Sequence, residues 1–318
     1  MKIIRELCDW TGRIHIGRWA DENVWQKAVE EVVFEWLSHT PKIENATADV
    51  MSWQKAGLLI GTNVGNPSGR WKDLCEELKN VEPSKINPEH LLLAYALKVR
   101  PHNVEAFVER HGKETIPYRA HERNVRYVDT LGMVVPYLHW TGRDELAVRQ
   151  MREYDNAMWN GVFPAHAYNV KYDVPMGTFD WSRGCGWYIL ALIESVDMEI
   201  TKEKILKLAE ALIPFQKTNG GYGCFIFNES ARMDSSGTAL IGLLMIAAYE
   251  YTRIDMFLEC AKRCEKALMA ATRRDGIVDF CQGDTIGIGN YSQTFSLMPF
   301  AQGMALKLAK SIEKYKMN

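Results

Sequence analysis

Residues 163–194 read FPAHAYNVKYDVPMGTFDWSRGCGWYILALIE, a polar and aromatic stretch that runs directly into an apolar one. The part from Trp181 onward has the length and composition of a buried helix. Arg183 lies at the predicted helix start, where backbone N–H groups and the helix dipole favour an anion. Trp181 and Trp187 add flat apolar faces, and the guanidinium of Arg183 suits a carboxylate. The stretch therefore indicates either a site for a planar acid such as a sugar acid, or a Trp-rich helix start packed into a core.

Helical periodicity continues on both sides of this stretch along the whole chain. Apolar residues recur at spacings of three and four, an apolar segment is often followed by an amphipathic one, and Asp, Pro and Gly stand at several predicted ends. Strand-like alternation is confined to short pieces such as residues 223–227. The spacing predicts about twelve helices, at residues 21–36, 49–61, 71–78, 88–97, 103–110, 127–140, 143–159, 181–196, 201–216, 235–251, 255–272 and 295–315.

The alternation of apolar and amphipathic helices predicts two concentric layers, because a helix that is apolar all round must be covered by others. No Pro/Gly/Ser-rich linker divides the chain, so residues 1–318 are expected to form a single domain. We therefore predict an all-α fold, an (α/α)6 barrel built as a toroid of six hairpins. Its long loops, at residues 112–129, 163–183, 218–236 and 281–293, would gather at one end of the ring.

Composition excludes several classes of protein. A net charge of −2 without a long basic block gives no footprint for nucleic acid. No apolar run approaches the roughly 20 residues of a membrane span, and the first 17 residues lack the apolar core of a signal peptide. We therefore expect a cytoplasmic protein with no membrane partner, whose seven cysteines are reduced thiols. Cys260 and Cys264 lack a second ligand pair for zinc, so no metal is expected.

Two loop-to-helix junctions carry residues suited to proton transfer. Asp129 stands among apolar residues near the start of the predicted helix 127–140; apolar surroundings raise the pKa of a carboxyl, whereas the helix start and Arg126 lower it. Its functional interpretation is a general acid that shares its proton with substrate, and the alternative is a simple helix cap. His166, in the turn before the Trp/Arg stretch, has Tyr168 and Asn169 beside it.

Two further junctions indicate structure rather than chemistry. The hydroxyls of residues 233–238 are best explained as caps of the next helix. The glycine-rich residues 287–292 match neither phosphate-binding pattern in order or context, so no nucleotide cofactor is expected.

Several motifs, in this order along the chain, resemble those of the unsaturated rhamnogalacturonyl hydrolases of glycoside hydrolase family 105, and more distantly the unsaturated glucuronyl hydrolases of family 88. They are RYVDTLGMVVPYL, PAHAYN, WSRGCGWYILALIE, DSSGTALIG and GIGNYS…MPFAQGMAL. The resemblance covers residue 50 to the C-terminus. It implies an (α/α)6 barrel that removes a terminal Δ4,5-unsaturated uronic acid from lyase-cleaved pectin fragments. Hydration of such a double bond needs only proton transfer and water, and the chain has no metal-ligand spacing, so no cofactor is expected.

By motif, the resemblance assigns Asp129 as the catalytic residue, supported by His166. The residues expected to bind the sugar are Trp53, His121, Asn169, Trp181, Arg183 and Trp187. The chain departs from the family pattern at Asn169, where Asp is common, and at Cys185, where Asn is usual. The family's second acidic residue, on an earlier helix, has no clear counterpart at residues 83–88.

Two other functions remain open at this point. One is a conventional glucuronidase or sugar epimerase on the same barrel, in which Asp129 works with Asp173 or Asp180, since ordinary glycoside hydrolysis uses two carboxyl groups. The other is a catalytically weakened sugar-binding protein. In every case the expected partner is a small oligosaccharide, and the protein is expected to be a monomer or a weak homodimer.

Overall fold

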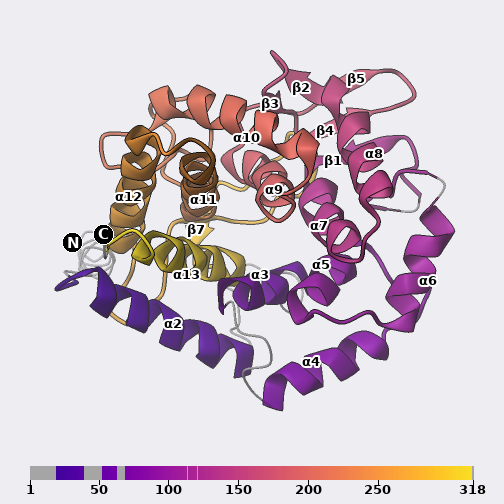
Figure 1. Ribbon diagram of the computed structural model, residues 1–318, viewed down its shortest axis with the longest axis horizontal. Helices are drawn as coiled ribbons and strands as arrows, with labels where there is room; N and C mark the ends of the chain where they lie inside the picture. Colours follow the sequence, from indigo (N-terminus) through magenta and orange to yellow (C-terminus); the bar gives the residue numbers. More distant parts are fainter. Residues whose placement is uncertain (1–18, 39–51, 63–68, 113, 120, 317–318) are drawn as a thin grey trace, which may run out of the picture.

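The computed structural model describes residues 19–38, 52–62, 69–112, 114–119 and 121–316. Within these ranges twelve α-helices form, and Figure 1 labels them as follows. They are α2 (Glu22–Ser38), α3 (Ser52–Thr62), α4 (Gly69–Lys79), α5 (Pro88–Leu97), α6 (His102–His111), α7 (Val128–Trp140), α8 (Asp144–Tyr154), α9 (Ser182–Ile193), α10 (Glu199–Leu212), α11 (Ser235–Thr252), α12 (Asp255–Ala270) and α13 (Pro299–Glu313).

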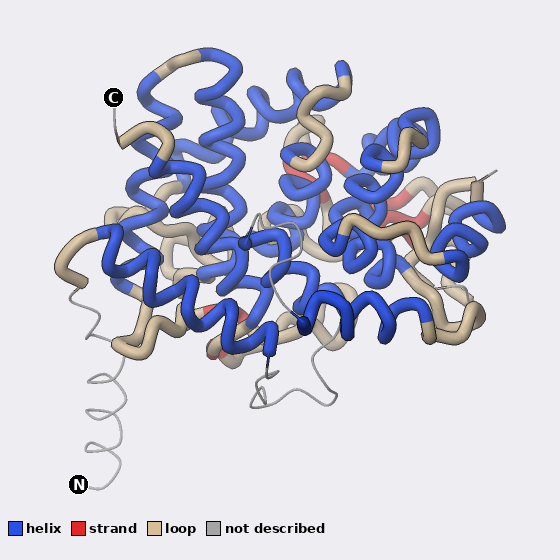
Figure 2. The backbone as a smooth tube through the Cα atoms, turned by 60° about the horizontal axis from the view of Figure 1, so that its bottom comes forward, coloured by secondary structure: helices blue, strands red, loops and turns tan. Residues whose placement is uncertain are grey.

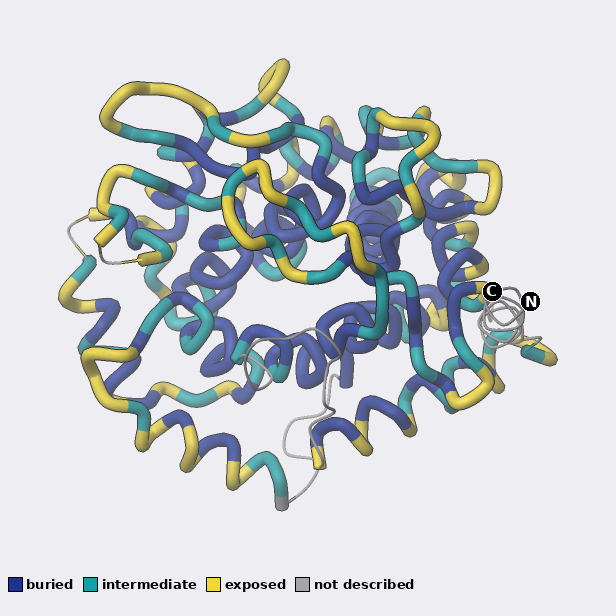
Figure 3. Tube along the Cα trace, turned by 180° about the vertical axis from the view of Figure 1, so that it is seen from behind, coloured by how far each residue is buried: buried dark blue, intermediate teal, exposed yellow. Residues whose placement is uncertain are grey.

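Six of these helices form a closed inner ring. Each packs on the next in the order α3, α5, α7, α9, α11, α13, and α13 returns to pack on α3 (Figure 1). The even-numbered helices lie outside and cover them. The inner helices are buried almost all round, whereas the outer ones alternate buried and exposed residues (Figure 3). The predicted all-α (α/α)6 barrel is therefore confirmed, including the ring closure that periodicity alone does not specify.

Glycine permits the contact that closes the ring. A Cβ atom on Gly61 of α3 would lie 2.2 Å from the backbone oxygen of Gly303 in α13, and one on Gly303 would lie 2.0 Å from the oxygen of Gly57. Any larger side chain would force the two helices apart. The first and last inner helices thus meet backbone to backbone.

The strands are short and lie among the loops between helices (Figure 2). β1 (Val125–Tyr127), β4 (Ala167–Asn169) and β5 (Val174–Met176) form one antiparallel sheet; β2 (Met158–Trp159) pairs with β3 (Phe163–Pro164), and β6 (Cys281–Gln282) with β7 (Phe295–Ser296). The strand expected at residues 223–227 is instead an irregular segment with isolated bridges from Phe225 to Trp181 and from Gly223 to Met233. These pairings with distant segments override the local alternation.

Two helix boundaries differ from the prediction for a related reason. The helix expected at residues 143–159 ends at Tyr154, and the chain then enters a 3-10 turn and β2. The helix expected from residue 295 begins at Pro299, because residues 295–296 pair with β6. The start expected at Asp49 lies outside the described residues.

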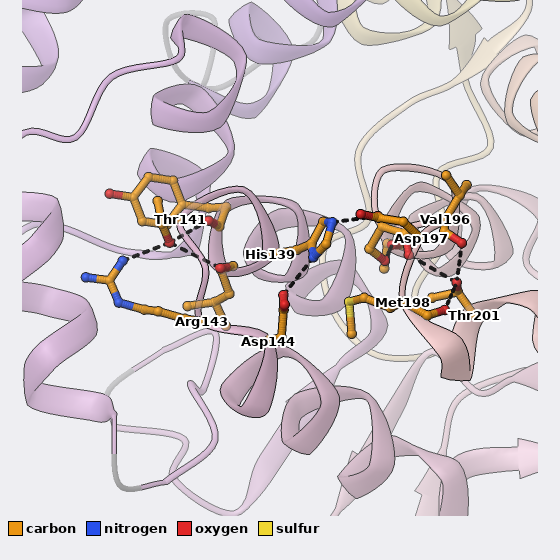
Figure 4. Close-up of polar contacts among 12 residues, drawn as sticks. His139, Thr141, Arg143, Asp144, Val196, Asp197, Met198 and Thr201 are labelled. Atoms are coloured by element: carbon orange, nitrogen blue, oxygen red, sulfur yellow. Dashed lines mark hydrogen bonds and ion pairs between the residues drawn. The ribbon is translucent and has the colours of Figure 1, made fainter.

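A polar cluster ties loops together at the C-terminal end of α7. Both ring nitrogens of His139 contact carboxylates, Nδ1 at 2.7 Å from Asp144 and Nε2 at 2.7 Å from Asp197, while Thr201 donates to nearby backbone carbonyls (Figure 4). Asp129 is in the first turn of the same helix, so this cluster lies about 15 Å away along the axis. No helix of the described residues is long and apolar enough to span a membrane.

Candidate active site

The small sheet β1–β4–β5 brings the two candidate catalytic residues together. Tyr127, at the end of β1, pairs with Ala167 at the start of β4, and the N–H of Val128 donates to the carbonyl of His166 at 3.0 Å. The next residue along α7 is Asp129. Its Oδ2 lies 3.9 Å from Nε2 of His166, so residues 37 positions apart in the sequence face each other.

A cavity of about 160 Å³ opens above this pair. Six of the eight predicted site residues line it: Trp53, Asp129, His166, Trp181, Arg183 and Trp187. The remaining lining residues come mainly from two loops and are Tyr118, Arg119, Tyr127, Met133, Asp284, Thr285, Ile286 and Gly287. Aromatic rings, two acids and two arginines thus converge on one small space.

The surroundings of Asp129 favour the protonated form of its carboxyl group. Its side chain is 19% exposed, yet Oδ2 is buried and has no hydrogen-bond partner. Burial raises the pKa of Asp129 to about 6, against the lowering effects of a backbone hydrogen bond at Asp129 and of the charge of Arg183. Arg126, which was expected to lower this pKa, has its guanidinium bound to Glu153 at 2.7 Å. Tyr127, at the N-cap position of α7, makes no side-chain cap hydrogen bond, and the carboxyl of Asp129 is hydrogen-bonded to its own backbone N–H in the first turn.

His166 faces Asp129 as a neutral ring. It is 3% exposed, and burial, followed by the charge of Arg183, lowers its pKa to about 4. Its Nδ1 lies 3.2 Å from the hydroxyl of Tyr291, and its ring packs on Trp181 with centroids 4.6 Å apart. The ring is therefore fixed in direction, with Nε2 turned to the carboxyl of Asp129.

The three tryptophans form the wall of the cavity rather than exposed platforms. Trp187 is 2% exposed and packs against both Trp53 and Phe300. Trp181 donates from Nε1 to Gln282 at 3.0 Å. Because these rings are wedged among other aromatic side chains, they give the cavity a rigid apolar boundary.

Arg183 lines the cavity, but its guanidinium is directed to the backbone. It is 2% exposed; Nη1 donates to the carbonyl of Gln282, and Nη2 donates to that of Gly283 at 2.7 Å. These contacts differ from the carboxylate that was expected as the partner of Arg183. The side chain anchors the segment that carries Asp284, and its charge acts on Asp129.

His121 and Asn169 lie outside the cavity. The side chain of His121 is 77% exposed and lies 4.0 Å from Glu122. Asn169 accepts hydrogen bonds from the N–H groups of Lys171 and Tyr172, so it closes the turn after β4. Both residues are close in sequence to residues of the site, but neither side chain reaches the cavity. The departure at Asn169 is therefore a feature of a turn, and Cys185, 1% exposed, is a core residue.

The alternative acids Asp173 and Asp180 are also absent from the cavity wall. Asp173 accepts a hydrogen bond from Tyr168, and Asp180 accepts one from Thr178. The carboxyl groups that do act on Asp129 are Asp284, which lines the cavity, and Glu89.

Glu89 is the acidic residue that sequence reasoning missed. It lies in the first turn of α5, accepts a hydrogen bond from Tyr118 at 3.0 Å, and is held near the cavity by a backbone hydrogen bond from Trp53. Burial raises its pKa above the ordinary value. The signal was present, since Glu89 directly follows residues 83–88, but a first-turn Glu after Pro88 is also an ordinary helix start.

Among the described residues no group of three or more His, Cys, Asp or Glu side chains is placed to hold a metal ion. Cys260 and Cys264 are buried free thiols in α12, as the sequence indicated.

The sequence matches no protein-family model and no curated protein. Solved structures do match over nearly the whole chain. A protein from Salmonella enterica, described as a possible member of the GH105 family, superposes with a TM-score of 0.74 at 15% identity, covering 94% of this chain and 96% of its own. An unsaturated glucuronyl hydrolase specific for heparin gives 0.69 at 13%, covering 92% and 98%. The unsaturated glucuronyl hydrolase of Bacillus sp. GL1 gives 0.66 at 13%, covering 92% and 97%. The chain shares their fold.

Proposed function

We propose that this protein is a hydrolase that removes a terminal Δ4,5-unsaturated uronic acid from lyase-generated oligosaccharides. Two supports are independent of each other. The fold is shared with proteins named as unsaturated glucuronyl hydrolases, and the motifs that resemble family 105 supply five of the expected site residues around one cavity, Asp129, His166, Trp181, Arg183 and Trp187. The cavity is small and lined by aromatic rings and by the acid Asp129, which suits one flattened sugar ring.

The observation that carries the proposal is the state of Asp129. A carboxyl whose pKa is raised to about 6, with a buried oxygen lacking a partner, keeps a fraction of its protons near neutral pH and can both give and regain one. The neutral ring of His166, with Nε2 at 3.9 Å from Oδ2 of Asp129, can orient water in the cavity that both residues line. A structural carboxylate would instead be expected to have its oxygens hydrogen-bonded.

The proposed chemistry is hydration of the double bond. Asp129 gives its proton to C4, water adds at C5, and the proton that this water loses returns to the carboxylate of Asp129. The hemiketal formed at C5 opens, which leaves a hemiacetal at C1 that expels the remaining oligosaccharide as an alcohol. One water is consumed and one acid/base suffices, so no pair of carboxyl groups needs to flank the glycosidic bond.

We further propose pectin or rhamnogalacturonan fragments as the source of the substrate, imported into the cytoplasm as small oligosaccharides. The support is the resemblance of the five ordered motifs to the rhamnogalacturonyl enzymes.

The decisive test is to incubate the protein with lyase-generated unsaturated disaccharides and follow the ultraviolet absorbance of the double bond. Hydration abolishes this absorbance as the oligosaccharide is released. A conventional glucuronidase would release the sugar with the absorbance intact, and a sugar-binding protein would change neither. Either of the last two results would contradict the proposal.

A further inference from the structure

Two cations line the cavity, and they are placed very differently. Arg183 is buried, and both of its terminal nitrogens donate to the backbone carbonyls of residues 282–283. The side chain of Arg119 is 54% exposed, and its ion-pair partner is Glu122 at 3.5 Å. A surface pair at that distance is weak and easily exchanged. Arg119 is therefore the lining cation whose fork can turn to a ligand.

The backbone that carries Arg119 is held firmly. The buried side chain of Gln150 accepts from the N–H of Ile116 at 2.8 Å and donates to its carbonyl at 2.9 Å. Tyr118 is fixed by its hydrogen bond to Glu89 and by packing on Tyr127. The guanidinium thus extends from an anchored segment, so little backbone ordering is needed when it binds.

The charges around the cavity make such a cation necessary for an acidic ligand. Asp129, Asp284 and Glu89 act on one another, so the region carries several carboxyl groups. Whenever these groups are ionised they repel a uronate, so its carboxylate needs a positive group whose donors are not already engaged. A planar guanidinium can donate two parallel N–H groups to a carboxylate. The guanidinium of Arg183 cannot, because its terminal nitrogens already donate to backbone carbonyls.

We infer that Arg119 is the residue that binds the carboxylate of the substrate, and that Arg183 instead positions the segment 281–284. This inference rests on the proposed function, because it assigns the acid group of the same substrate. It moves to Arg119 the carboxylate-binding role that was expected of Arg183.

The test compares a lyase-generated disaccharide bearing a terminal unsaturated uronic acid with its methyl ester. Dissociation constants come from the fluorescence of the cavity tryptophans, and turnover comes from loss of ultraviolet absorbance. We expect Arg119→Gln to weaken binding of the acid by about tenfold to a hundredfold and binding of the ester by less than about twofold. Arg119→Lys, which keeps the charge without the fork, should fall between.

Arg123→Gln is the matched control, because Arg123 is an exposed arginine four residues along that does not line the cavity. It should leave both constants unchanged. Equal weakening of acid and ester by Arg119→Gln, or no change in either, would overturn the inference while leaving hydration intact. If the wild type binds the acid without loss of absorbance, the proposed function fails and the binding ratio still decides the role of Arg119. If it binds neither compound, both are overturned.

Discussion

Replacing Asp129 by Asn tests the proton donor while keeping the shape of the side chain. The amide has the size and polarity of a protonated carboxyl but cannot release a proton. Since Oδ2 of Asp129 has no hydrogen-bond partner, the substitution breaks no hydrogen bond at that atom. We expect turnover to fall by about 10²–10⁴-fold, which is the usual contribution of general acid–base catalysis. Affinity should survive, because the cavity walls are unchanged.

The same substitution should make the protein more stable above pH 6. The pKa of Asp129 is raised to about 6 from an ordinary 3.8, so the folded state disfavours the charged form. At about 1.4 kcal/mol for each tenfold change in the acid constant, that difference corresponds to at most about 3 kcal/mol. The penalty is absent below pH 4, appears as the pH rises to about 6, and is constant above it. Asn carries no charge and avoids the penalty at every pH.

Both effects can be measured on one purified variant. Loss of ultraviolet absorbance reports turnover, and urea unfolding at pH 4 and pH 7.5 gives the free energy of unfolding. Asp255→Asn is the matched control, since Asp255 is an exposed Asp in the first turn of α12. It should keep full turnover and change stability by no more than about 0.5 kcal/mol at either pH.

The reasoning would be refuted by a folded Asp129→Asn protein with normal turnover. It would also be refuted by a variant whose stability relative to the wild type is the same at both pH values, because the carboxyl would then not be held in an unfavourable charged state.

Three further predictions concern the pH dependence of the reaction and the residues that hold the segment 281–284 in place. The value of kcat/KM should rise as the pH increases through about 4, where His166 loses its proton, and fall as the pH increases through about 6, where Asp129 loses its proton. If kcat/KM of the wild type did not fall above pH 6, Asp129 would not be the acid. Arg183→Lys should lower the melting temperature and reduce kcat/KM equally for the acid and methyl ester substrates, because lysine cannot reach the carbonyls of both Gln282 and Gly283; selective loss for the acid would return the carboxylate to Arg183. Asp234→Asn should destabilise by about 1–3 kcal/mol in urea unfolding, because Asp234 accepts from Ser182, Ser236, Gly237 and Gln282, and an amide must leave at least one of these buried donors without a partner; unchanged stability would show that water replaces the lost acceptor.

The hydrogen bonds of Asp234 also correct the sequence interpretation of residues 233–238. A cap at this helix start was expected from the hydroxyls, and the structure does have one there. The capping group is the carboxylate of Asp234, which accepts from the N–H of Gly237 at 2.9 Å, while Ser236 donates to it. The pattern indicated the position of the cap, and the choice among three adjacent polar side chains was made by contacts with α9 and β6.

The sequence by itself determined the helices and their order. Apolar spacings of three and four are a local property, so they can be recognised without knowing which helices pack together. The inner helices are apolar in sequence because each is covered on every side. Motifs whose order resembles that of a family also allowed six residues to be assigned to one site from the sequence: Asp129, His166, Trp53, Trp181, Arg183 and Trp187. Each of these positions lies at or near a loop-to-helix junction, and in a ring of hairpins such junctions gather at one end.

Tertiary structure alone decided what each of these side chains does. Arg183 meets Gln282 across 99 residues of sequence, and the N–H of Gln282 in turn binds Asp234 across 48. No local pattern encodes such contacts, because they depend on which helices close the ring. The same closure brings Glu89, Arg119 and Asp284 beside Asp129 and leaves His121 and Asn169 outside. A pKa is set by burial and by nearby charge, so the acid strength of Asp129 exists only once the barrel has closed around it.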